Sequence, residues 1–190
     1  MAYLSRKNLE ALGFKSLGRN VKVSDKASIY DAEKISIGDN SRVDDFCILS
    51  GEIFIGKYVH ITPMCLIAGG KPGVVLKDFC TLAYGVKVFA QSDDYSGETM
   101  VNSLIPKKFK EETFERVTLE RHVVVGTNAV ILPGVNVAEG CAIGAMALLN
   151  KSTNSWGVYI GSPAKRFKER KQNLLKLEKQ FLQENYNDSI

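Results

Sequence analysis

The stretch that decides the fold is LERHVVVGTNAVILPGVNVAEGCAIGAMALL, residues 119–149. An aliphatic residue stands at every sixth position, and a small or β-branched residue stands four positions after each of the first five. A helix repeats every 3.6 residues and a simple strand every two, so neither gives this period. Short strands that turn a corner after each hexapeptide do give it, and they stack into a β-solenoid. The aliphatic positions are Leu119, Val125, Ile131, Val137, Ile143 and Leu149, and the smaller set is Val123, Ala129, Val135, Cys141 and Ala147.

The same period extends toward the N-terminus with one interruption. It begins weakly at Val23 and is regular from Ile37, and three hexapeptides make one turn of a triangular coil. From Ile67 to Leu76 the spacing is nine residues instead of six. The intervening GGKPG, residues 69–73, predicts a three-residue bulge at a corner, because glycine and proline suit a tight irregular turn. We therefore expect an all-β fold, a parallel solenoid of hexapeptide repeats.

The regions outside the period define the expected domain organisation. Residues 1–22 are expected to form an N-terminal helix and lead-in, with an amphipathic helix at 4–17. The solenoid is expected at 23–163, and a basic amphipathic helix and tail at 164–190, lying across the end of the coil. The period fails completely at 92–116, which is polar and long. Such an excursion is usually functional or disordered, and loops on a rigid scaffold often carry the chemistry.

Composition limits the class of protein. The chain has 190 residues, 45% hydrophobic and 24% charged, which suits one soluble domain. It contains no apolar run long enough for a membrane span or a signal peptide, so a cytoplasmic protein is expected. The net charge of +4 is too small to indicate nucleic-acid binding, and the positively charged residues are not interleaved with exposed aromatic residues. The basic residues gather at the start of the last segment, where a phosphate-bearing ligand could meet them.

The four cysteines share the inward phase of the repeat. Cys47, Cys65, Cys80 and Cys141 each fall four positions after an inward aliphatic residue, and no CxxC spacing occurs. We interpret them as core residues and not as disulfide partners, metal ligands or acyl-carrying nucleophiles.

Only two histidines are present. His60 precedes the inward Ile61 and His122 lies three positions after Leu119, so both are expected to point outward. A neutral imidazole is a suitable general base near pH 7, and the alternative is a surface or interface histidine. Two histidines are too few for a three-histidine zinc site, so no metal is expected.

Two adjacent carboxylates, Asp93 and Asp94, open the excursion. A carboxylate there could orient an imidazole, accept a proton or bind sugar hydroxyls. The alternative is that both are solvated or form a turn.

These motifs resemble the hexapeptide-repeat, left-handed β-helix acyltransferases, close to the galactoside, maltose and polysaccharide O-acetyltransferases. The resemblance covers about residues 23–170 and depends on residues 123–149, on GSPAKR at 161–166 and on the excursion before the last coils. It implies a homotrimer with active sites between subunits, acetyl-CoA in the groove between neighbours, and the acceptor near the excursion. It also implies which residues line the CoA groove: Thr127, Ala145, Asn150, Lys151, Lys165 and Lys168.

The chemistry of this set fits the implied ligand. A small side chain lets pantetheine approach the backbone, and lysines attract phosphates; a solvated helix face is the alternative for those lysines. The chain departs from the family at the start of the excursion, where Gln91-Ser92-Asp93 replaces the catalytic histidine. His60 is therefore the first candidate base, with Asp93 or Asp94 assisting, and His122 stays open.

The expected function is acetyl transfer from acetyl-CoA to a sugar hydroxyl, assisted by a general base, in the biosynthesis of a surface polysaccharide. One alternative is N-acetylation of a nucleotide-linked amino sugar, since an amine needs less help from a base. A second is a non-catalytic solenoid subunit that supports assembly. The acceptor cannot be read from the residues, because the scaffold serves many substrates.

Overall fold

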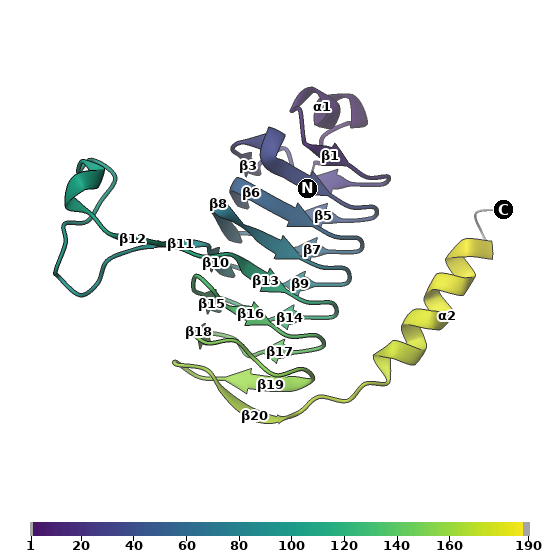
Figure 1. The fold of residues 1–190 in the computed structure, drawn as a ribbon. Coiled ribbons are helices and arrows are strands. Elements are labelled where there is room, and N and C mark those ends of the chain that lie inside the picture. Colours follow the sequence, from purple (N-terminus) through teal and green to yellow (C-terminus); the bar gives the residue numbers. More distant parts are fainter. Residues whose placement is uncertain (1, 188–190) are drawn as a thin grey trace.

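The computed structural model describes residues 2–187, and the side chains as far as residue 184. The chain winds into a triangular coil whose short parallel strands stack on three faces (Figure 1). Among the described residues, neither helix has the length and apolarity needed to span a bilayer.

The three faces are named here by the strands that form them. Two long strands turn the corner from face 1 to face 2: β6 (Ile48–Ile55) and β8 (Leu66–Leu76). Face 1 also contains β3 (Ser28–Ile29), β10 (Lys87–Phe89), β15 (Val130–Ile131) and β18 (Leu148–Leu149). Face 2 also contains β1 (Ser16–Leu17), β4 (Ile35–Ile37), β13 (Val117–Leu119) and β16 (Asn136–Val137). Face 3 contains β2 (Lys22–Val23), β5 (Arg42–Val43), β7 (His60–Ile61), β9 (Thr81–Leu82), β14 (Val124–Val125), β17 (Ala142–Ile143), β19 (Gly157–Ile160) and β20 (Lys165–Glu169).

The core is the stack of inward aliphatic residues that the period predicts. On face 2, Ile37 pairs with Ile55, Ile55 with Leu76, Leu76 with Leu119, and Leu119 with Val137. All of these side chains are buried. Parallel pairing in strict register places an aliphatic side chain of one coil on that of the next, so that each coil buries its neighbour's side chain. The predicted hexapeptide ladder is therefore confirmed.

The cysteines confirm their predicted core position. All four are free and buried. Burial raises the pKa of the Cys80 thiol to about 12, so it carries no nucleophilic thiolate at neutral pH.

The predicted bulge is present on the corner between faces 1 and 2. The β6–β8 ladder shifts register around Gly51, which pairs with Gly70. Both glycines have positive φ, and their backbones touch where a Cβ would clash. Glycine is required here because the chain turns the corner without leaving the sheet.

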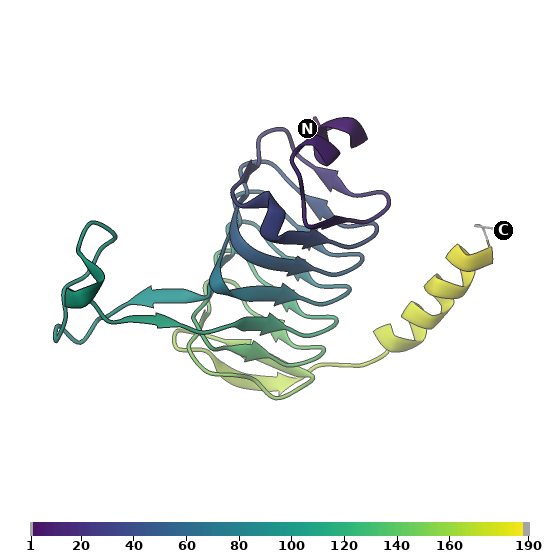
Figure 2. The ribbon, with the colours of Figure 1, turned by 45° about the horizontal axis from the view of Figure 1, so that its top comes forward.

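The excursion is an arm that projects away from the coil (Figures 1 and 2). Its root is an antiparallel hairpin of β11 (Gln91–Asp93) and β12 (Glu112–Phe114), and its tip contains the 3₁₀ turn η2 (Lys107–Phe109). The absence of the hexapeptide period thus marks a different structure and not an unstructured loop.

Both termini differ from expectation. The N-terminal helix α1 covers only Arg6–Ala11, because Gly13 turns the chain with φ +73°, and the coil already begins with β1. A second 3₁₀ turn, η1, spans Ala32–Lys34.

The C-terminal segment does not enter a helix at Ala164. It first forms β20, antiparallel to β19, and α2 (Leu174–Asn187) follows. The last coil would otherwise present an open strand edge, and β20 forms hydrogen bonds with part of that edge. Helix α2 then runs back along the side of the coil and not across its end (Figures 1 and 2).

Candidate functional site

His60 lies on face 3 and contacts a buried carboxylate. Its Nε2 is 2.9 Å from Oδ2 of Asp44, whose side chain is 2% exposed. Arg42 donates to the same carboxylate from Nε at 2.6 Å and from Nη2 at 2.9 Å. Burial by itself would raise the pKa of Asp44, but the hydrogen bonds from Arg42 and His60 outweigh it and hold that pKa below its usual value.

This pairing decides which ring nitrogen of His60 is basic. An ionised carboxylate only accepts hydrogen bonds, so Nε2 of His60 is protonated and donates a hydrogen bond to Asp44. The Nδ1 lone pair is left as the basic site. The His60 side chain is 38% exposed, so it is open to a ligand on face 3.

Tyr3 closes the buried side of the pair. Its hydroxyl donates to Oδ1 of Asp44 at 3.1 Å, and its ring lies beneath the cationic groups of Lys22 and Arg42. Burial, followed by the charge of Asp44, raises the pKa of the Tyr3 phenol, which therefore remains a donor. The N-terminal residues thus hold the carboxylate in place.

Asp44 is not among the residues predicted from the sequence. A signal for it exists in the period: one coil places Arg42 beside His60, and Asp44 stands two residues further on the same outward side. The carboxylates chosen instead, Asp93 and Asp94, lie on the arm. Within one chain the structure does not bring them to His60, because the arm and β7 lie on different sides of the coil (Figure 1).

Asp94 forms a turn within the arm. Its carboxylate accepts hydrogen bonds from the Ser96 amide at 2.7 Å and from the Thr99 hydroxyl at 2.9 Å. These bonds, led by the Ser96 amide, lower the pKa of Asp94 to about 2. Asp93 stands opposite Glu112 in the register of the two hairpin strands.

His122 points away from the core, as expected, but it is not exposed. Helix α2 covers it, and only 8% of the residue is accessible. Its Nε2 lies 2.9 Å from Oε2 of Glu178, and its ring stacks on Phe79 with centroids 5.2 Å apart. Arg121 pairs with the same Glu178 carboxylate. Sequence periodicity gave the direction of the side chain but not the helix that covers it.

The residues expected to line a CoA groove are all exposed but do not form one row. Thr127 and Ala145 stack on the corner between faces 3 and 1, where the Met146 amide donates to the Thr127 carbonyl at 2.8 Å. Lys165 pairs with Ile160 at the same edge. The other three lie elsewhere: Asn150 and Lys151 follow β18 on face 1, and Lys168 stands further along β20.

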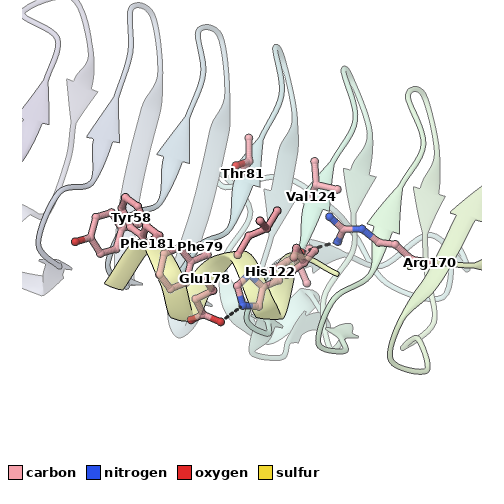
Figure 3. A pocket seen from close by; sticks show the side chains of 11 residues that line it. Tyr58, Phe79, Thr81, His122, Val124, Arg170, Glu178 and Phe181 are labelled. Atoms are coloured by element: carbon pink, nitrogen blue, oxygen red, sulfur yellow. Dashed lines mark hydrogen bonds and ion pairs between the residues drawn. The ribbon is translucent and has the colours of Figure 1, made fainter. Parts of the chain in front are cut away.

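A groove of about 570 Å³ lies between face 3 and α2 (Figure 3). Thr81 and Val124 line it from face 3, and its lining is mostly apolar. At one end, Arg170 donates from Nη1 to the carbonyls of His122 at 2.7 Å and Gly140 at 2.8 Å. The complete lining is Tyr58, Phe79, Thr81, His122, Val123, Val124, Arg170, Leu174, Leu177, Glu178 and Phe181.

The part of the chain that the structure describes contains no group of three or more histidine, cysteine, aspartate or glutamate side chains able to hold a metal ion.

Comparison with known proteins identifies the family. No family model matches the chain. The dTDP-4-amino-4,6-dideoxy-D-glucose acyltransferase of Escherichia coli is 40% identical over 184 residues, which is 95% of each protein. The chain belongs to the hexapeptide-repeat acyltransferases.

Solved structures agree with this family assignment. AntD, an N-acyltransferase from Bacillus cereus, superposes with a TM-score of 0.96 at 40% identity, over 97% of this chain and 98% of AntD. A hexapeptide-repeat acetyltransferase of Vibrio cholerae shares the fold, with a TM-score of 0.64 at 17% identity over 88% of this chain and 77% of that protein.

These relatives contradict the expectation of O-acetylation. The Escherichia coli relative is named for an amino sugar, and AntD is an N-acyltransferase. The O-acetyltransferase expectation was wrong because the hexapeptide ladder is common to enzymes of both kinds, and the ladder carried that expectation.

Proposed function

We propose that this acyltransferase moves an acyl group from acyl-CoA to the amino group of a dTDP-linked 4-amino-4,6-dideoxy sugar. One observation carries the proposal. A single-site mutant of AntD holds dTDP-4-amino-4,6-dideoxyglucose and coenzyme A together, and the chain matches that structure with a TM-score of 0.95 at 40% identity over 96% of its length. The acyl group is left open, since AntD also holds 3-hydroxybutyryl-CoA.

The proposed reaction needs a neutral amine. The amine nitrogen attacks the thioester carbonyl, the C–N bond forms, and the C–S bond breaks as the tetrahedral intermediate collapses. His60 is suited to take the ammonium proton at Nδ1 and return it to the departing thiolate. Asp44 then stabilises the imidazolium through the 2.9 Å contact with Nε2.

We propose that this reaction occurs between copies in a homotrimer, as the sequence resemblance implies. The corner between faces 3 and 1 supports this, because it exposes a row of large apolar side chains next to Thr127 and Ala145. Rows of this kind mark interaction surfaces. The row is Phe46, Met64, Tyr84 and Met146, the last being 70% exposed. Sedimentation of the purified protein tests the trimer, and a monomer at assay concentrations refutes it.

The assay of function compares two acceptors that differ at one atom. Free thiol is measured with acetyl-CoA or butyryl-CoA as donor and dTDP-4-amino-4,6-dideoxyglucose as acceptor, and in parallel with the analogue that carries a hydroxyl in place of the amine. We expect thiol release only with the amine, together with an amide product detected by mass spectrometry. Equal release with the hydroxyl analogue, or no release with the amine and either donor, refutes the proposal.

A further inference from the structure

We propose that the groove between face 3 and α2 receives the acyl chain of the donor, so that the enzyme favours acyl groups longer than acetyl. This inference rests on the proposed function, because it needs an acyl-CoA bound on face 3. It assigns a task to α2 that the transfer step itself does not use.

The groove begins one rung away from His60 on face 3. Thr81 is the direct rung neighbour of His60, and Val124 is the next neighbour of Thr81. Both side chains line the groove (Figure 3). Thr127, expected near the donor, lies three residues beyond Val124 on the same coil. A thioester attacked beside His60 would therefore extend its acyl chain over Thr81 toward α2.

The helix forms a wall without filling the space. Leu174, Leu177 and Phe181 line the groove from α2, yet Leu177 remains 54% exposed. A helix that served only to cover the coil would bury these side chains against it. A hydrocarbon chain would remove them from water, which is the main driving force for apolar binding.

The charged groups at the groove already have partners. Glu178 accepts from Arg121 and contacts His122. Arg170 donates to three backbone carbonyls, and burial lowers the pKa of its guanidinium. A phosphate or carboxylate would have to break these pairs, whereas an alkyl chain would not. The groove is therefore suited to the apolar end of the donor and not to its nucleotide.

The test measures donor binding without an acceptor. Dissociation constants of CoA, acetyl-CoA, butyryl-CoA and hexanoyl-CoA are determined by calorimetry for the wild type and for Leu177→Trp, Leu177→Ala and Lys179→Trp. Lys179 lies on the opposite side of α2 from Leu177, so Lys179→Trp adds the same ring away from the groove. Each buried methylene changes affinity roughly fourfold, so two methylenes give up to about fifteenfold.

We expect the wild type and Lys179→Trp to bind butyryl-CoA about tenfold more tightly than acetyl-CoA. Leu177→Trp should remove most of this preference. Leu177→Ala should shift the preference toward a longer donor, hexanoyl-CoA. Opposite shifts from one position cannot both come from misfolding.

Two outcomes overturn the inference. One is a wild type that binds butyryl-CoA no more tightly than acetyl-CoA. The other is a Leu177 series that weakens every ligand equally, CoA included, since the pantetheine arm or a second copy of the chain would then occupy the groove. Failure of the proposed function is a separate result: donor binding would follow the expected pattern, but no thiol would be released with the amino sugar.

Discussion

Replacing Asp44 with asparagine tests whether the buried carboxylate controls His60. The Asp44 carboxylate accepts two hydrogen bonds from Arg42, one from His60 and one from Tyr3. An asparagine amide has one oxygen and no charge, and its NH₂ group would face donors. The Asp44→Asn variant therefore loses several charge-assisted bonds and the group that fixes the His60 tautomer.

The structure sets the size of the stability loss. Breaking a fully buried ion pair costs about 3–5 kcal/mol. Here Arg42 is 41% exposed and His60 38% exposed, so water can solvate both after the substitution. We expect a loss of about 1–3 kcal/mol, or a melting temperature lower by roughly 2–10 °C.

The stability difference should depend on pH in a defined direction. The pKa of Asp44 is lower in the folded protein than in the unfolded chain. Its contribution is therefore complete above about pH 4 and is lost as the pH falls through the folded-state pKa. Thermal melts of wild type and Asp44→Asn should converge below pH 4.

The effect on activity follows from the histidine. A positioned general base contributes about 10²–10⁴-fold, so we expect Asp44→Asn to lower kcat at pH 7 at least tenfold with little change in KM. The loss should shrink above pH 9, where the amine acceptor is neutral without help. Asp44→Asn combined with His60→Gln should be no slower than His60→Gln alone, since both act on one proton transfer.

Asp45→Asn is the matched control. Asp45 is the neighbouring carboxylate, and it pairs with Ser24 and Lys26 and not with His60. It should retain wild-type kcat. A folded Asp44→Asn enzyme with wild-type kcat at pH 7, or independent multiplicative losses in the double variant, would refute the role given to the pair.

Three further perturbations test the scaffold. Leu119→Ala should cost about 2–5 kcal/mol in denaturant unfolding, because it opens a cavity in the buried stack, whereas Thr118→Ala on the same strand should cost far less. Gly140→Ala should cost more than about 1 kcal/mol and change Trp156 emission, since φ is +69° and the new Cβ would meet the indole; unchanged emission and stability would disprove this packing. Asp94→Asn should speed amide exchange in the arm at pH 7 but not near pH 2. Because the pKa of Asp94 is lowered, its carboxylate stabilises the turn above about pH 4 and this stabilisation is lost as the pH falls to about 2. Equal exchange in wild type and variant at pH 7 would refute this role of Asp94.

Much of the fold was accessible from the sequence because it is locally encoded. Each hexapeptide specifies its own strand and corner, and the next coil repeats the instruction at short range. Counting residues in sixes was enough to predict the inward direction of Cys80 and Leu119 and the glycine bulge at 69–73. The arm was identified as the region where the count fails, but its hairpin was not.

The site was less accessible because it depends on contacts between coils. His60, its outward direction and its rung neighbour Arg42 could be read from the period, but the contact between His60 and the buried Asp44 carboxylate depends on side-chain packing that the count does not give. The arm carboxylates Asp93 and Asp94 were attractive only because loops often carry chemistry. In the structure, the bonds of Asp94 lie within its own turn.

The sequence by itself determined the solenoid, its axis of buried residues and the family resemblance, since a period of six fits short strands that turn a corner after each hexapeptide. The tertiary structure alone decided the partner of His60, the burial of His122 and the position of α2. The physical reason is one of range. The ladder arises from neighbours a few residues apart and one coil away, whereas the Glu178–His122 contact joins residues 56 positions apart. No local pattern encodes such a contact, and it depends on β20 returning the chain across face 3 before α2 begins.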